Sequence, residues 1–139
     1  MDKPADLGIA HLRVVRLSDD LAPVVEFYRD GLGFEVLSEF KDHEGFDGVI
    51  LGHREAAYHL AFTHKAGYTA GRAPTDDNLL VFYVPDQAEW ERGVRRLEQL
   101  GYKPVKSSNP YWDYTGKTFE DPDWYRVVRQ QASWPARPR

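Results

Sequence analysis

The sequence predicts an α+β fold made of two tandem copies of one strand–helix–strands unit. Two apolar runs with strand character, residues 7–16 and 77–84, are each followed by an acidic residue and then by a helical pattern. Each helical pattern ends near a glycine that precedes an aromatic residue, Gly33-Phe34 in the first copy and Gly101-Tyr102 in the second. Corresponding positions lie 67 or 68 residues apart. Such a repeat predicts two units built on the same plan, each too small to bury its own sheet face.

The first copy is expected to begin with a strand over residues 9–17, in which His11, Arg13 and Val15 share one face because side chains alternate along a strand. A helix is expected after residues 18–20, whose short oxygen side chains accept hydrogen bonds from free backbone N–H groups. Gly31 is expected to end that helix. Strands over 34–40, 46–51 and 58–63 complete the copy, and His59 and Ala61 share a face of the last one.

The second copy is expected to begin with a strand over residues 78–84. Its helix starts at Asp86, a capping residue followed by Glu89 three positions later, and ends at Gly101. A short edge strand is predicted over 102–106 because Pro104 interrupts it. An aromatic-rich loop over 107–116 and strands over 117–120 and 125–130 follow.

A chain of 139 residues is expected to form a single domain over residues 1–139. The first module is predicted at 7–65, a linker rich in glycine and proline at 66–77, and the second module at 78–132. Residues 1–6 and the tail over 133–139 are expected to be flexible.

Composition excludes several classes of function. The net charge of −4 provides no basic surface for nucleic acid, and the chain has no cysteine for disulfides or thiolate chemistry. No run reaches the roughly 18 apolar residues of a membrane span. The N-terminal residues lack the apolar core of a secretion signal. We therefore expect a cytoplasmic protein that has neither a nucleic acid nor a membrane as its partner.

The stretches Glu26-Phe-Tyr-Arg-Asp-Gly-Leu-Gly-Phe34 and Phe119-Glu-Asp-Pro-Asp123 resemble the vicinal-oxygen-chelate superfamily. This superfamily includes glyoxalase I, extradiol dioxygenases, fosfomycin-resistance enzymes and bleomycin-binding proteins. Within it, the sequence motifs of the chain look like those of a bacterial subgroup. The resemblance covers about residues 9–130. It implies two βαβββ modules with curved mixed sheets and a concave cavity, and it implies a homodimer. In one departure, Trp124 replaces the glycine of the family turn Asp-Pro-Asp-Gly, at a cost of about 1 kcal/mol if that position has a positive φ.

The resemblance places the metal ligands of the superfamily at His11, Ala61, Asn78 and Val128. Only His11 is of the expected type, and Asn78 offers a neutral amide oxygen. A catalytic divalent ion needs about three protein ligands. A shifted site made of His11 and His59, with Asp47 if the strand register allows it, is the alternative. We therefore expect no metal and no other cofactor.

Other side chains are candidates for holding a ligand directly. Arg126 is expected to share the face of Val128, and its guanidinium group suits paired oxygen atoms. Tyr111 and Trp112 lie in the loop that the resemblance places at the cavity mouth. His11 and His59 are also candidate general bases, because imidazole titrates near neutral pH. The predicted ligand-binding residues are His11, Arg13, Asp47, His59, Asn78, Tyr111, Trp112 and Arg126.

Three functions are compatible with these residues. The first is metal-free binding of an aromatic or amphipathic small molecule, a sequestration like that of resistance proteins. The second is a glyoxalase-like lyase or dioxygenase with a degenerate or shifted metal site. The third is a metal-independent enzyme that uses a pocket histidine as its general base. We favour the first because the family positions lack the carboxylate that would offset the charge of a metal ion.

Overall fold

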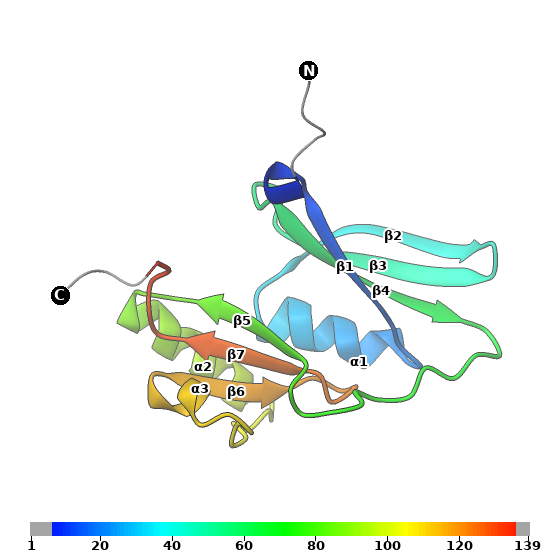
Figure 1. The fold of residues 1–139 in the computed structure, drawn as a ribbon. Helices are drawn as coiled ribbons and strands as arrows, with labels where there is room; N and C mark the ends of the chain where they lie inside the picture. Colours follow the sequence, from blue (N-terminus) through cyan, green and yellow to red (C-terminus); the bar gives the residue numbers. More distant parts are fainter. Residues whose placement is uncertain (1–6, 136–139) are drawn as a thin grey trace. The chain divides into compact units, whose positions relative to one another are not determined.

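The computed structural model describes residues 7–135, and the chain divides into two compact units, Met1–Ala70 and Gly71–Arg139 (Figure 1). Of the segments expected to be flexible, 1–6 and 133–139, residues 1–6 and 136–139 lie outside the described residues. Each unit contains one sheet and the helix that follows its first strand, as the repeat predicts. Within residues 7–135, no helix has the length and apolar character needed to cross a membrane.

The first unit is a four-stranded mixed sheet with the strand order β1-β4-β3-β2. A short 3-10 helix, η1 (Leu7–Ile9), precedes β1 (Leu12–Leu17), and β1 runs parallel to β4 (Tyr58–Lys65). The hairpin of β2 (Glu35–His43) and β3 (Phe46–Gly52) completes the sheet through antiparallel pairing of β3 with β4. The order of elements is therefore the predicted βαβββ.

The helix of the first unit changes its winding partway along. It begins as α1 (Leu21–Val25), where the Asp20 carboxylate accepts a hydrogen bond from the backbone N–H of Ala22, and continues as the π-helical segment η2 (Glu26–Gly31). Phe27 and Tyr28, neighbours in η2, are both completely buried. The ring of Tyr28 lies 4.8 Å from that of Phe62 on β4, so this helix covers the sheet face that carries Phe62. The predicted end at Gly31 is confirmed, whereas the apolar pattern did not indicate the π-helical turn.

The second unit has a three-stranded sheet with the order β5-β7-β6, made of β5 (Leu79–Tyr83), β6 (Gly116–Glu120) and β7 (Arg126–Gln130). The other elements are α2 (Gln87–Gln99) and the short helix α3 (Tyr111–Tyr114). The predicted strand over 102–106 is wrong, because only Val105 forms an isolated bridge, to Thr118. Pro104 has no N–H group for a ladder, which explains why pairing does not extend further.

Helix α2 covers one face of this second sheet. The Trp90 indole N–H donates to the Arg129 carbonyl at 2.8 Å, and Arg129 Nη2 donates to the carbonyls of Glu89 and Trp90 at 3.3 and 3.4 Å. Arg129 therefore lies beneath the helix together with Val127, its neighbour on the same face. Arg126 and Val128 alternate with these residues, so they lie on the face opposite α2.

Trp124 has a backbone φ of 71°, so the turn keeps the left-handed conformation for which the family turn uses glycine. Its side chain is half exposed, and the guanidinium carbon of Arg72 lies 4.3 Å from its ring centroid. The Asp121 carboxylate also holds the turn by accepting hydrogen bonds from the N–H groups of Asp123 and Tyr125. A cation–π contact is worth about 0.5–1 kcal/mol at an exposed site, the same order as the conformational cost.

Candidate functional site

The candidate site lies on the face of the first sheet that the helix leaves uncovered, which we call the helix-free face. Phe62 and Leu60 point to the helix-covered side of β4, so His59, Ala61 and Thr63 point to the opposite side. Arg13, Val15 and Leu17 of β1 pair directly with these three residues and share their face. Val15 is 57% exposed, so this face is accessible at β1, whereas Ala61 on β4 is only 4% exposed.

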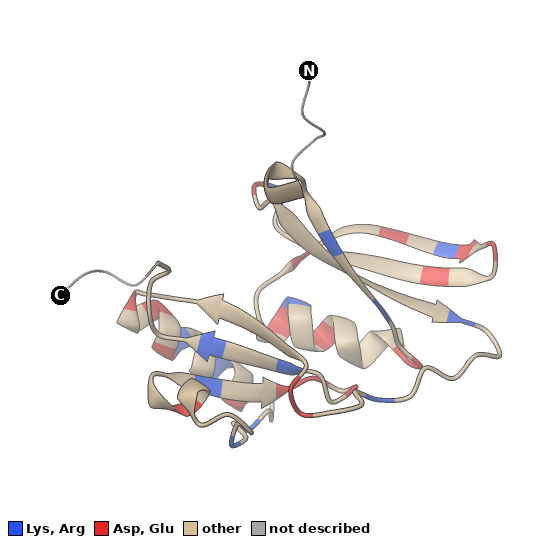
Figure 2. Ribbon diagram, in the orientation of Figure 1, with Lys and Arg blue, Asp and Glu red and all other residues tan. Residues whose placement is uncertain are grey.

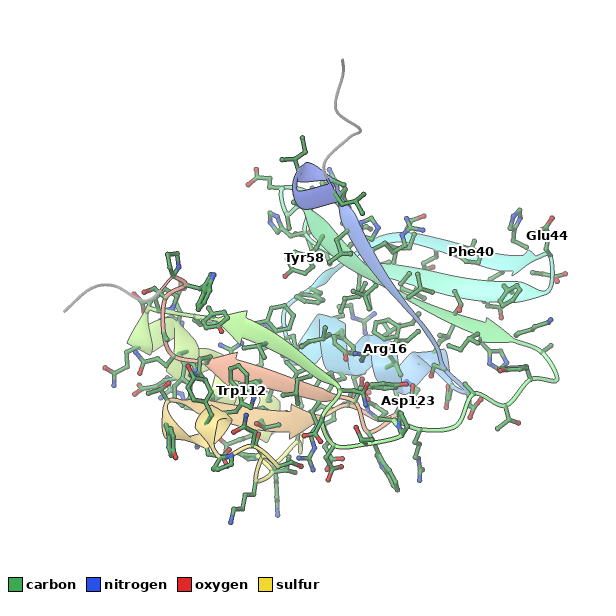
Figure 3. The ribbon with its side chains drawn as sticks, viewed as in Figure 1. Arg16, Phe40, Glu44, Tyr58, Trp112 and Asp123 are labelled. Carbon is green, nitrogen blue, oxygen red and sulfur yellow. The ribbon has the colours of Figure 1, made fainter. Side chains whose placement is uncertain are left out.

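Pairing across all four strands arranges the helix-free face in three rows. A β-bulge after Val36 keeps β2 in step with its neighbours, so Ser38 and Phe40 lie on the same face as Glu35. The polar row contains Arg13, His59, Gly52 and Glu35; the middle row contains Val15, Ala61, Ile50 and Ser38; the third row contains Leu17, Thr63, Gly48 and Phe40. Figure 3 marks Phe40 on β2, at the far end of the third row.

Three side chains of the first unit meet at the β1 end of the polar row. His11 Nε2 lies 2.9 Å from His59 Nδ1, and Arg13 Nε donates to His59 Nε2 at 2.7 Å. The predicted convergence of His11 and His59 is therefore present. The donation from Arg13 requires a lone pair on His59 Nε2, so a neutral His59 carries its proton on Nδ1 and donates it to His11. A neutral His11 in turn carries its proton on Nδ1, where it is a hydrogen-bond donor.

The electrostatics of this cluster, which we call the His11–Arg13–His59 cluster, keep His59 neutral. Desolvation lowers the pKa of His59, and the electrostatic effects of the neighbouring Arg13 and His11 lower it further. Among residues 7–135, no carboxylate forms an ion pair with Arg13. Figure 2 shows that positive charge predominates on β1, which carries basic residues and no acidic one. The cluster is thus a cationic site to which residues 7–135 supply no counter-ion.

The donor atoms of the cluster do not suit a metal ion. Both nitrogen atoms of His59 are engaged, one by Arg13 and one by His11, and a guanidinium group 2.7 Å away repels a dication. Ala61 and Val128 have no ligating side-chain atom. Within the described part of the chain, no three His, Asp or Glu side chains are grouped as a metal site. The residues at the family positions therefore do not fit the family metal.

Asp47 is not brought to the two histidines. It pairs with His64, on the helix-covered side of the sheet, and its Oδ1 accepts a hydrogen bond from the N–H of Asp42 at 2.8 Å. There it lines a cavity of about 580 Å³ together with α1 residues such as Leu21 and Val25. The register therefore separates Asp47 from the histidines by placing it on the other face.

The pairing register of the second unit moves Asn78 out of the position expected for it. Arg13 pairs with His59 in the first unit, but Leu79 pairs with Arg126 in the second, one residue earlier than the repeat predicts. Asn78 is thus out of phase with the residues on the side of the second sheet opposite α2, since a one-residue slip exchanges the two faces of a strand. Its amide donates to Thr75 Oγ1 at 3.0 Å.

The remaining candidates also lie in the second unit. Arg126 is 8% exposed, and its Nη1 donates to the Lys106 carbonyl at 3.2 Å. Its Nη2 lies 3.6 Å from Asp76 and 3.9 Å from Glu120, so this arginine has internal counter-ions. Tyr111 and Trp112 lie on α3, where their ring centroids are 5.0 Å apart in an edge-to-face arrangement. Trp112 is labelled in Figure 3. Their role in binding stays a prediction.

Two residues of the polar row were not among the predicted site residues. Gly52 separates His59 from Glu35, and a Cβ atom at Gly52 would lie 3.0 Å from the Cβ of His59. The Leu37 side chain reaches the same position, with its Cδ1 3.4 Å from that Cβ site, so an apolar methyl group lies beside Gly52. Simple alternation placed Glu35 in phase with Leu37, and only the bulge in β2 brings it into phase with Ser38 and Phe40. The charge of Glu35 was the one sequence feature that could have indicated a place among the site residues.

The comparisons with known proteins agree with the two-unit organisation. Residues 12–63 match the YycE-like N-terminal domain, and residues 77–131 match the YycE-like C-terminal domain. An uncharacterised protein of Bacillus subtilis (strain 168), YycE, is 42% identical over 119 residues, which are 86% of each chain. The chain belongs to the YycE-like family. The two YycE-like matches fall within the two compact units, one in each.

Solved structures identify the fold that YycE-like proteins share. A crystal structure of a Bacillus subtilis YycE protein of unknown function has a TM-score of 0.84 at 40% identity and covers 90% of this chain and 91% of its own. Glyoxalase I from Leishmania major has a TM-score of 0.67 at 18% identity, with 86% and 84% covered. TnmS3, an antibiotic binding protein from Streptomyces sp. CB03234, has a TM-score of 0.61 at 20% identity, with 89% and 95% covered. The α+β fold of the vicinal-oxygen-chelate superfamily is thereby confirmed for this YycE-like chain.

Proposed function

We propose that the protein binds an aromatic or amphipathic small molecule on the helix-free face of the first unit, without a metal ion, and so sequesters it. The observation that supports this most is the row arrangement, in which the His11–Arg13–His59 cluster borders an apolar strip made by Val15, Ala61 and Ile50. An amphipathic molecule needs both kinds of surface side by side. TnmS3, which has the same fold, is an antibiotic binding protein.

The free energies allow such binding when polar contacts assist it. A flat ligand that buries about 300 Å² of apolar surface gains about 7 kcal/mol. Association costs at least about 4 kcal/mol, so apolar contact alone supports only about millimolar affinity. Hydrogen bonds to charged groups add about 1.5–3 kcal/mol each. The cluster at the polar row is the part of this face that provides them.

The two enzymatic alternatives have less support from the geometry. A lyase or dioxygenase needs a metal, and the donor atoms at the family positions do not fit one. A general base needs an imidazole nitrogen with a free lone pair. The lone pair of His59 accepts from Arg13, and that of His11 accepts from His59. Catalysis by either histidine would therefore have to break one of these hydrogen bonds first, and we place binding ahead of it.

The experiment that tests the proposal is titration with phenylnaphthylamine, a neutral aromatic probe whose fluorescence rises in apolar surroundings. We expect saturable binding at one site per chain, weaker than that of an amphipathic ligand because the neutral probe makes no charged contact, and unaffected by exhaustive treatment with a chelator. Val15→Lys places a charge in the middle row at an exposed position, so it is expected to weaken binding about tenfold or more without unfolding the sheet. Leu100→Lys, at an exposed position in the second unit, is the matched control. Equal affinities of all three proteins would contradict the proposal.

We also propose that the protein is a cytoplasmic homodimer. In the first sheet β1 is an edge strand, and its chain segment exposes Leu7, Ile9 and Leu12. An edge strand with exposed apolar side chains tends to acquire a partner. Sedimentation is expected to give about twice the chain mass of 16.0 kDa. A mass equal to that of one chain at micromolar concentration would refute the dimer.

A further inference from the structure

We infer that the molecule bound on the helix-free face is an organic anion, and that Arg13 and His11 hold its charged oxygen atoms. This inference rests on the proposed function, because it assigns a chemical class to the ligand of that same face. It concerns the end of the polar row next to β1, where the cluster lies.

Arg13 is the cation that makes this end of the row attractive to an anion. A guanidinium group has five N–H donors, and the Nε–H of Arg13 is used by His59. That hydrogen bond fixes the direction of the side chain, while its Nη groups form no hydrogen bond to any residue between 7 and 135. Arg126 in the second unit is the contrast, because it lies near the carboxylates of Asp76 and Glu120. A fixed guanidinium without a counter-ion is suited to paired oxygen atoms from outside.

The tautomers of the two histidines provide a second N–H donor beside Arg13. His59 accepts from Arg13 and donates to His11, so the remaining proton of a neutral His11 is on Nδ1. Within the described residues this N–H has no acceptor, so it can donate to a ligand oxygen. Every group that the cluster presents to a ligand is therefore a donor, and none is an acceptor. A ligand whose polar end is a donor, such as an amine, finds no partner here.

Glu35 makes the two ends of the polar row different in charge. It occupies the other end of the polar row, two strands away from His59, which is about 10 Å at the usual strand spacing. Its carboxylate repels an anion from that end, and Gly52, with the Leu37 methyl group beside it, separates Glu35 from the cluster. The anionic group is thus directed to the Arg13 end. The middle row begins about 7 Å away along the strands, so an aromatic ring joined directly to the anionic group reaches it.

The test compares two probes that share one ring system. Anilinonaphthalene sulfonate is phenylnaphthylamine with an added sulfonate, which stays ionised throughout the neutral range. By fluorescence titration at low ionic strength, we expect the sulfonate probe to bind about tenfold to 100-fold more tightly than the neutral probe. Arg13→Met keeps a long apolar side chain but removes the charge, and it is expected to abolish most of this preference. Arg54→Met removes the same charge from an exposed position in the turn between β3 and β4, and is expected to preserve it.

The outcomes separate this inference from the proposed function. If the neutral probe binds and the sulfonate adds no affinity, the anion assignment is overturned while the proposed function stands. If the preference survives in Arg13→Met, or is lost equally in Arg54→Met, the assignment to Arg13 is overturned. If neither probe binds to a protein with normal circular dichroism, the proposed function fails and the inference falls with it. Loss of the preference in Arg13→Met alone, with an unchanged affinity for the neutral probe, supports the inference.

Discussion

Tyr28→Ala is expected to lower the free energy of unfolding by about 4 kcal/mol, the cost of truncating a fully buried aromatic side chain. Tyr28 is completely buried, and its ring contacts those of Phe27 at 4.9 Å, Phe62 at 4.8 Å and Phe34 at 6.1 Å. Alanine would leave a cavity where the helix meets the first sheet. Urea denaturation followed by circular dichroism measures the effect.

Tyr68→Ala is the control for this prediction, because it makes the same chemical change at a residue that is 54% exposed. Its effect is expected to stay within about 0.5 kcal/mol. Similar losses in the two variants would show that Tyr28 does not hold the helix on the sheet. The Tyr28→Ala substitution is also expected to disturb the helix-free face, since β4 carries Phe62 on one side and His59 on the other.

Gly116→Ala is expected to cost about 2 kcal/mol, in the range found for added atoms in well-packed regions. A Cβ atom at Gly116 would meet the Gln130 side-chain oxygen first, and it would also lie 2.7 Å from the Trp112 carbonyl oxygen and 3.1 Å from that of Arg129, both of which are backbone atoms. Relief of the clash therefore requires α3 to move away from β6, which would also displace Trp112 and its partner Tyr111. The same denaturation experiment gives the magnitude.

Gly93→Ala is the informative comparison, because there the nearest atom to an added Cβ would be even closer than at Gly116. That atom belongs to the end of the flexible Arg129 side chain, which can move at low cost. Alanine also favours a helix interior by about 1 kcal/mol over glycine. The cost of Gly93→Ala is therefore expected to be smaller than that of Gly116→Ala. The opposite ranking would mean that Arg129 is held beneath α2 more rigidly than its two hydrogen bonds to backbone carbonyls suggest.

Much of the fold was predictable because it depends on local patterns. The repeat, the caps at Asp20 and Asp86 and the end of the first helix at Gly31 each follow from residue type and spacing, and the structure has all of them. Alternation also placed His11, Arg13 and His59 on one face. Their hydrogen bonds require only that β1 and β4 are neighbours, which the βαβββ plan provides.

The features that were not predicted depend on registers that no local pattern determines. The bulge in β2 moved Glu35 into the polar row, and a one-residue slip between β5 and β7 moved Asn78 out of its expected position. The register of β3 places Asp47 opposite His64, on the helix-covered side of the sheet. A pattern with period two cannot reveal such shifts, because each depends on how two distant strands align. The predicted strand near Pro104 failed for a local reason that the proline itself indicated.

Each strand of the first sheet supplies one residue to every row of the helix-free face, and this has a consequence for how recognition changes over evolution. The hairpin of β2 and β3 provides half of each row, including Glu35, Ile50 and Phe40, whereas Arg13 and His59 come from the other two strands. Variation at the uncharged hairpin positions of these rows would therefore change the shape of the molecule that the face accepts, while Glu35, Arg13 and His59 keep the charge requirement. Related proteins that retain these three residues and diverge mainly within residues 36–52 would then form a set of receptors with the same electrostatic selectivity and different size preferences.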